Sequence, residues 1–144
     1  EVKADNPAIA ALIAGQVSLL EARAASLAGE RAQLAERITQ IENQITGAKA
    51  QQNALQTQLL LLEPELRNQQ DLLSRGLTQA ASVSTLQREE AQLIGSIAEI
   101  DAVIAESRGR IAEIELESLR IDSAVSRVSR PSPFQSFATR LHVL

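Results

Sequence analysis

The sequence predicts an all-α fold, a long antiparallel two-helix coiled-coil hairpin, and three observations predict it. Apolar residues recur at heptad spacing in two long segments. Both patterns lapse between the segments, around Gly76. The 144-residue chain is 44% apolar, yet it has only two Phe and no Trp, Tyr, Met or Cys. This composition is typical of coiled coils, whose seams do not need the large aromatic side chains of a globular core.

The first helix is expected over residues 7–73, with Asn6 as N-cap and Pro7 at the first helical position. Pro64 predicts a kink and not an end, because the heptad pattern continues beyond it. Arg31 and Gln52 are either tolerated polar layers or determinants of register and partner choice. The d positions of the seam are Ile13, Leu20, Leu27, Leu34, Ile41, Ala48, Leu55 and Leu62, and the a positions are Val17, Ala24, Arg31, Ile38, Ile45, Gln52, Leu59, Leu66 and Leu73.

The tip of the hairpin is expected over residues 74–82 and the second helix over residues 83–129. Gly76 can adopt a left-handed backbone conformation without steric cost, and Ser82 to Ser84 offer side-chain oxygens for a helix cap. The facing residues of the two helices are expected to include Leu34, Ile41, Leu55, Ile97, Ile104 and Ile114.

The second helix is shorter than the first, so the N-terminal part of the first helix lacks a partner within the hairpin. Ile13, Val17 and Leu20 continue the apolar stripe there, and such a stripe seldom stays uncovered. Either a longer parent protein supplies a return segment, or a second copy of the chain covers these residues. The sequence therefore predicts a self-association contact at this stripe.

Residues 131–144 differ from the rest of the chain. They hold Pro131, Pro133, both phenylalanines and His142, which is the only histidine of the sequence. The prolines end the helix, and the residues before them favour extended conformations. A non-helical tail of foreign origin, such as vector sequence, is expected after the hairpin at residues 1–130.

Composition and charge exclude several classes of function. The net charge of −4 comes from interspersed acids and bases, so no basic surface for nucleic acid is expected. With no Cys, one His in the tail and no phosphate loop, we expect no enzyme, no metal, no cofactor and no small-molecule substrate. We expect no signal peptide and no run of roughly 20 apolar residues, hence a soluble fragment. The cysteine content leaves the redox compartment open.

The ordered set of motifs resembles the HlyD-type membrane fusion proteins, the periplasmic adaptors of bacterial type I secretion systems, especially the branch of protease and lipase exporters. The resemblance covers roughly residues 7–122. It is carried by Leu72-Leu73-Ser74-Arg75-Gly76-Leu77 at the tip, Leu86-Gln87-Arg88-Glu89-Glu90-Ala91-Gln92-Leu93 and Arg110-Ile111-Ala112-Glu113-Ile114-Glu115-Leu116 after it, and Ala14-Gly15-Gln16 and Leu20-Glu21-Ala22-Arg23 before it.

The resemblance implies a periplasmic hairpin of a longer protein that is anchored in the inner membrane and forms homo-oligomers. It implies an inner-membrane ABC transporter and a TolC-like outer-membrane channel as partners, with the channel docking at the hairpin tip. In related adaptors an Arg, a Leu and a Ser or Thr at the tip are associated with docking. Aligned on Gly76, Leu72 matches the Leu, whereas Asn68 and Gln79 stand at the other two positions, with Arg67 and Thr78 one residue away.

The tip residues expected to contact the partner are Leu72, Arg75, Gly76, Leu77, Thr78 and Gln79. An end-on contact favours one apolar anchor within a polar surround, and Leu77 fits that role. Alternatively, Leu77 folds back onto Leu73 as a contact at the end of the helix. Two further functions remain open, a structural or signalling coiled coil that acts by oligomerisation and an amphipathic lipid-binding bundle, although only Lys3 and Lys49 would serve the latter.

Overall fold

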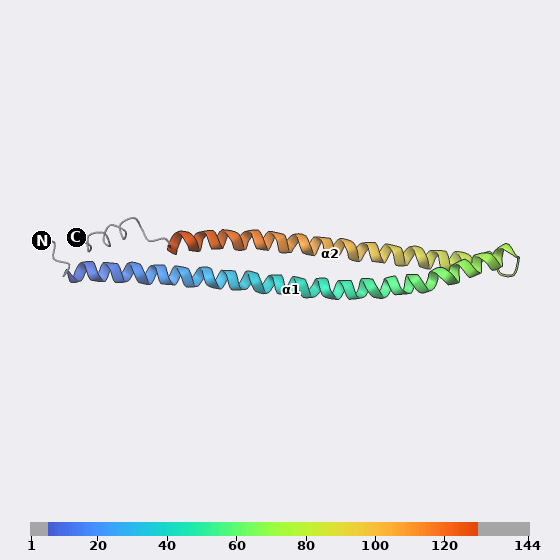
Figure 1. The fold of residues 1–144 in the computed structure, drawn as a ribbon, viewed down its shortest axis with the longest axis horizontal. Helices are drawn as coiled ribbons and strands as arrows, with labels where there is room; N and C mark the ends of the chain where they lie inside the picture. The colour runs from blue at the N-terminus through green and yellow to red at the C-terminus, as the bar shows by residue number, and fades with distance from the viewer. Residues whose placement is uncertain (1–5, 130–144) are drawn as a thin grey trace, which may run out of the picture. The chain divides into compact units, whose positions relative to one another are not determined.

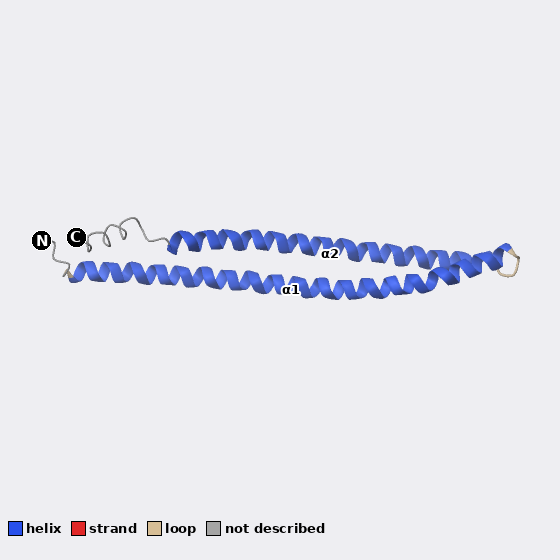
Figure 2. Cartoon of the chain, viewed as in Figure 1, coloured by secondary structure: helices blue, strands red, loops and turns tan. Residues whose placement is uncertain are grey.

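Two helices make up the described part of the protein. The structure is a computed structural model, and it describes residues 6–129. Helix α1 spans Pro7–Ser74 and helix α2 spans Ala80–Ser129, with a short turn at residues 75–79. No strand occurs within residues 6–129 (Figure 2). The predicted all-α hairpin is confirmed.

Contacts divide the chain into two units, and each unit pairs part of α1 with part of α2. We call Glu1–Ile38 with Glu113–Leu144 the terminal unit, and Thr39–Ala112 the tip unit. Within each unit the two helical stretches lie side by side and run in opposite directions (Figure 1). The turn belongs to the tip unit.

The start of α1 is fixed by the cap that the sequence predicts. The Asn6 Oδ1 atom accepts a hydrogen bond from the Ala8 N–H at 3.1 Å, and the Asn6 carbonyl accepts from the Ile9 N–H at 2.9 Å. Asn6 thus satisfies donors that a helix N-terminus leaves without intrahelical partners. Pro7, which has no N–H to satisfy, takes the first helical position.

The seam of both units follows the heptad pattern. The predicted facing residues Leu34, Ile41, Leu55, Ile97 and Ile114 are half-buried, and Ile104 is 4% exposed. Two helices can cover only one face of each other, so most seam side chains remain partly in solvent. The buried apolar side chains are Ile45, Leu62, Leu66, Val83 and Ile104 in the tip unit and Ile121 in the terminal unit.

The seam of α2 is regular over its full described length. Its positions that are not exposed include two series at seven-residue spacing, namely Val83, Glu90, Ile97, Ile104, Ile111, Ser118 and Val125, and Leu86, Leu93, Ile100, Ser107, Ile114, Ile121 and Val128. We treat the first series as a positions and the second as d positions. Of these positions, Ile97, Ile104 and Ile114 were predicted from the sequence as facing residues. Glu90, Ser107 and Ser118 were not, because polar residues do not continue an apolar repeat.

Helix α1 passes through Pro64 without ending. Pro64 is exposed, and the stretch of α1 near the turn, drawn in green, bends toward α2 (Figure 1). A proline on the outer face removes one backbone hydrogen bond there and allows the helix to curve around its partner. The helix therefore reaches Ser74, as the continued seam indicated.

The boundaries at the turn differ from the predicted tip at residues 74–82. Helix α2 begins at Ala80, three residues before the predicted position. The carbonyl of Gln79 accepts a hydrogen bond from the Ser82 N–H at 3.1 Å, so Gln79 occupies the N-cap position. The prediction of a cap at Ser82 to Ser84 was wrong, because Ala80 and Ala81 are strong helix formers and extend the helix ahead of the serines.

Candidate functional site

Backbone hydrogen bonds shape the turn of the tip unit. The Leu77 N–H donates to the carbonyl of Leu72 at 2.9 Å, and the Gly76 N–H donates to the carbonyl of Leu73, also at 2.9 Å. This pair of bonds is a Schellman motif, which satisfies carbonyls at a helix C-terminus. It requires a left-handed residue, and Gly76 supplies it with φ of 72°.

Leu77 is the exposed apolar residue of this turn. Its side chain is 70% exposed, while Leu72 and Leu73 on α1 are half-buried. A Schellman motif often packs its last residue against the helix. Here Leu77 leaves most of its surface in solvent, so any contact with Leu73 covers only a small part of it.

Polar residues precede and follow Leu77 in the turn. The Arg75 guanidinium forms an ion pair with the Asp71 carboxylate at 3.0 Å, and both side chains are more than half exposed. The Ser74 hydroxyl donates to the carbonyl of Asp71 at 2.6 Å. Gln79 is exposed and Thr78 is half-buried. The turn therefore combines one exposed apolar side chain with several hydrogen-bonding groups.

Three of the six buried apolar side chains of the described residues lie in the helix stretches that lead to the turn. Leu62 is 7% exposed, Leu66 6% and Val83 5%, and the three lie on the helix ends next to the turn. Each buried side chain of this kind contributes roughly 1.5–3 kcal/mol through removal from water. This packing holds the two helix ends together, so the turn is presented on an ordered support.

The second predicted contact lies in the terminal unit. Ile13 is 60% exposed, Val17 48% and Leu20 46%. Ile9, Leu12 and Leu19 add further exposed apolar surface on the same stretch. We call these six residues the N-terminal stripe. Among the described residues, nothing covers it.

The N-terminal stripe also affects the expectation about membrane segments. By length and composition alone, one helix of the described residues, α1, is long and apolar enough to cross a membrane. The apolar window lies near the N-terminus, has a mean hydropathy of 1.4 and is not buried. The expectation rested on uninterrupted apolar runs, and in this stretch Gly15, Gln16 and Ser18 interrupt the apolar residues.

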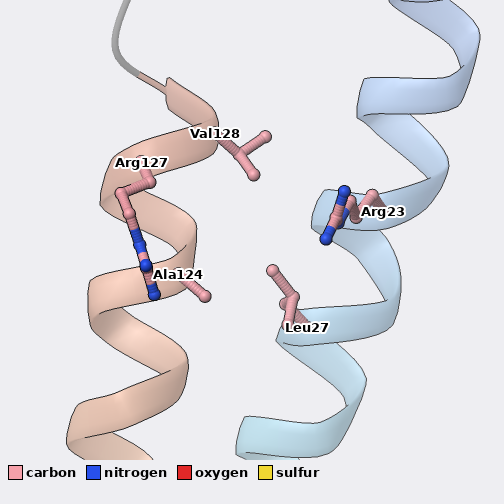
Figure 3. A pocket seen from close by; sticks show the side chains of 5 residues that line it. All are labelled: Arg23, Leu27, Ala124, Arg127 and Val128. Carbon is pink, nitrogen blue, oxygen red and sulfur yellow. The ribbon is translucent and has the colours of Figure 1, made fainter.

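The shallow hollow of Figure 3 lies in the terminal unit, near the described end of α2. It has a volume of about 360 Å³ and is lined by Arg23, Leu27, Ala124, Arg127 and Val128. The side chains of Leu27 and Ala124 point toward each other across the space (Figure 3). The hollow is open, and no group of three or more His, Cys, Asp or Glu within residues 6–129 is arranged to hold a metal ion.

The family of the chain follows from its match to known sequences. Residues 1–129 match the family model described as AprE, long alpha-helical hairpin. The chain belongs to this family. The match covers both helices and the turn, so the AprE-type hairpin confirms the resemblance that the tip and heptad motifs indicated.

A curated relative of this AprE-type hairpin is the type I secretion system membrane fusion protein PrsE of Rhizobium meliloti (strain 1021). The two are 35% identical over 115 residues, which is 80% of this chain and 26% of the relative. The chain thus spans about a quarter of the length of the curated relative that it matches. No solved structure matches it closely enough to be informative.

The residues of the AprE-type hairpin at the positions of the expected docking Arg differ in type or make contacts on their own helix. Asn68, at the position of the related Arg, is exposed. Arg67, one residue away, donates through Nε to the carbonyl of Glu63 at 3.4 Å, on its own helix. Arg75 is the arginine nearest to Leu77 in the sequence, and it forms an ion pair with Asp71. This ion pair was not predicted, although an acid four residues before an arginine is a common ion-pair spacing.

Proposed function

We propose that this hairpin is the periplasmic adaptor element of a type I protein secretion system, and that its tip docks onto a TolC-like outer-membrane channel. An inner-membrane ABC transporter supplies the energy, and the hairpin acts without enzymatic activity. The full-length protein is anchored in the inner membrane. The observation that carries the proposal is the exposed Leu77 at the centre of a polar turn in an AprE-type hairpin.

The chemistry of the tip fits an end-on contact. Interfaces are usually dominated by a few central residues, which are surrounded by contacts that exclude water. Leu77 provides an apolar anchor, and Arg75, Thr78 and Gln79 provide donors and acceptors around it. The name of the R. meliloti relative, a type I secretion system membrane fusion protein, supports the same role.

The test is a double substitution at the tip of the full-length adaptor, Leu77→Asp with Arg75→Glu. We expect secretion of the substrate to be abolished, because loss of a central anchor typically weakens an interface by 2 kcal/mol or more, roughly thirtyfold in affinity. Helicity and melting temperature of the hairpin should stay unchanged, since both side chains are exposed. Secretion and circular dichroism are measured on the same variant.

Two controls separate docking from folding. Asp71→Ala breaks the same ion pair but keeps Arg75 and Leu77, and it should secrete normally. Substitutions at exposed mid-helix positions, Gln40→Ala and Glu99→Ala, should also be silent. Secretion at the parental level by a folded tip double variant in the cell envelope would exclude docking through this tip and favour a structural coiled coil that acts by oligomerisation.

We also propose that the N-terminal stripe is a contact with a second copy of the chain. The described part of α2 ends at Ser129, and Ile13, Val17 and Leu20 stay exposed. They continue the a and d series that pairs with a helix elsewhere in the chain, so a helix is the partner that fits. A homo-oligomer supplies that helix without a further protein.

A further inference from the structure

The two polar residues in the a series of α1 are both paired with aspartates of α2. In the tip unit, Gln52 Nε2 donates to Asp101 Oδ1 at 2.8 Å. In the terminal unit, Arg31 Nη1 lies 3.0 Å from Asp122 Oδ1. Every other a position of α1 is apolar. Each polar residue that interrupts the apolar a series of α1 therefore has an aspartate of α2 as its partner.

The matching is specific to aspartate and to one position of the heptad. Asp101 and Asp122 are the only aspartates within Ala80–Ser129. They lie 21 residues apart (122 − 101), as do Arg31 and Gln52 (52 − 31), which is three heptads. Each Asp directly follows a d position of α2, Ile100 or Ile121. Both pairs thus correspond to the same register of α1 against α2.

That alignment also locates the turn. The residue numbers add to 153 in both pairs (52 + 101 and 31 + 122). Half of 153 falls between Gly76 and Leu77, within the Schellman motif. A shift of one heptad changes the sum to 146 or 160 and moves the centre of the turn to Leu73 or Ala80. The paired residues and the position of Leu77 at the tip are therefore linked.

A shift in either direction places Asp101 of the tip unit opposite an apolar residue, while Gln52 meets an apolar residue in one direction and an arginine in the other. With a sum of 146 or 160, Asp101 would face Ile45 or Leu59, and Gln52 would face Ile94 or Arg108. The Arg31–Asp122 pair of the terminal unit distinguishes less well between the native and the shifted registers. With a sum of 146, Arg31 would face Glu115, a new acidic partner, whereas with a sum of 160 Asp122 would face Ile38.

These pairs cannot matter mainly through the stability of the native alignment. The Arg31 and Asp122 side chains are 60% and 38% exposed, and exposed pairs contribute little to stability. A single polar residue at an a position can instead fix register, because every other register leaves it without a partner. The heptad repeat alone does not distinguish registers, since each shift by seven residues again brings apolar residues face to face.

We propose that Asp101 and Asp122 are positioning residues that fix the register of the hairpin and thereby keep Gly76 and Leu77 at its tip. The Gln52–Asp101 pair selects against shifts in both directions. The Arg31–Asp122 pair selects mainly against the shift to a sum of 160. This role holds whatever the tip binds, so it stands or falls separately from docking to a channel.

Cysteine cross-linking within single chains measures the register directly, because the sequence has no cysteine of its own. All reporter positions lie in the tip unit. The native reporter, with a sum of 153, is Leu59→Cys with Ile94→Cys. The two reporters of shifted registers are Leu59→Cys with Gln87→Cys, for a sum of 146, and Leu66→Cys with Ile94→Cys, for a sum of 160. Yields are compared in the monomer band of the 144-residue chain.

The decisive variant replaces the tip-unit pair by Gln52→Leu with Asp101→Leu. We expect the yield of the 59–87 cross-link to rise about tenfold, the factor given by one hydrogen bond to a charged group. The 66–94 yield should stay low, because the intact Arg31–Asp122 pair still opposes that shift. The melting temperature should stay equal or rise, since a leucine at position 52 continues the apolar seam and no unpaired polar group is left facing it. A variant that keeps its melting temperature but populates a second register has lost a positioning role. A merely structural role would instead lower the melting temperature and leave the register unchanged.

Two further variants complete the test. Asp101→Asn keeps an oxygen acceptor for Gln52 and should retain the native cross-link alone. Gln40→Leu with Glu99→Leu adds two leucines at exposed positions and should also leave the register unchanged. If the Gln52→Leu, Asp101→Leu variant still forms only the 59–94 cross-link, the turn alone sets the register, and the proposal is wrong.

Discussion

At the scale of single residues, Gly76 determines how α1 ends. Its φ of 72° lies in a region that side chains with a Cβ atom disfavour. A Cβ atom placed on Gly76 would meet no other atom within 4 Å. The cost of a larger residue here is therefore one of backbone strain and not of steric contact with neighbours.

Gly76→Ala tests this account. We expect the free energy of unfolding to fall by about 1–2 kcal/mol, the cost of a left-handed conformation for an L residue. Gly95→Ala is the matched control, because Gly95 lies inside α2 and its Cβ atom would also meet open space. This control should raise stability by roughly 0.5–1 kcal/mol. Chemical denaturation followed by circular dichroism measures both, and equal effects of the two substitutions would contradict the role of Gly76.

The sequence allowed part of the site to be predicted at this scale. Gly76 was identified because glycine is favoured where the chain reverses, and Leu77 because it stands beside polar residues. The exposure of Leu77 could not be predicted, since Schellman motifs place this residue either against the helix or in solvent. The partners Asp101 and Asp122 were missed because they flank the apolar series of α2 and do not interrupt it.

At the scale of the helices, Pro64 is the main irregularity of α1. The exposed proline interrupts the backbone hydrogen bonds on the outer face of the helix, next to the buried Leu62 and Leu66. The bend seen near the turn lies toward α2 (Figure 1). A curve of this kind favours close packing of the helix ends beneath the tip.

Pro64→Ala measures what this irregularity costs. Restoration of the missing hydrogen bond should raise the free energy of unfolding by up to about 3 kcal/mol, the penalty of proline inside a helix. Thermal unfolding followed at 222 nm gives the change, with Gln58→Ala as a nearly neutral control on the same helix. A lower stability of Pro64→Ala would mean that the bend itself is needed to pack Leu62 and Leu66.

The helices were more predictable than the turn between them. Heptad spacing over many turns gives a redundant signal, so single polar residues such as Gln52 do not hide it. The predicted tip was too long because serines near a helix start attract a cap assignment, whereas alanines ahead of them continue the helix. Register could not be predicted from the seam, since a heptad repeat pairs equally well after a shift by seven residues.

At the scale of the whole molecule, the N-terminal stripe predicts assembly. Replacement of Ile13, Val17 and Leu20 by Gln should convert any dimer of the 144-residue chain to monomer in sedimentation experiments, because it removes apolar surface worth about 25 cal/mol per Å². The equivalent triple substitution at Leu60, Leu61 and Leu116, which are also exposed apolar residues, is the control and should leave assembly unchanged.

The same experiment distinguishes other ways to cover the stripe. A parent chain that is monomeric and remains so after substitution contradicts self-association. Flotation with neutral phospholipid vesicles then shows whether lipid takes the place of the second copy, as the mean hydropathy of 1.4 near the N-terminus would allow. Loss of flotation in the triple variant would assign the stripe to a membrane surface.

The Schellman turn allows the side chains at the tip of this hairpin to be exchanged for others without a change in the backbone. Its conformation depends on two backbone hydrogen bonds and on Gly76, while the side chains of Arg75, Leu77, Thr78 and Gln79 do not form those bonds. These four positions can therefore vary without rebuilding the support beneath them. Hairpins with the same turn could diverge to recognise different partners by changing only this surface, and a tip grafted from one to another should carry its preference with it.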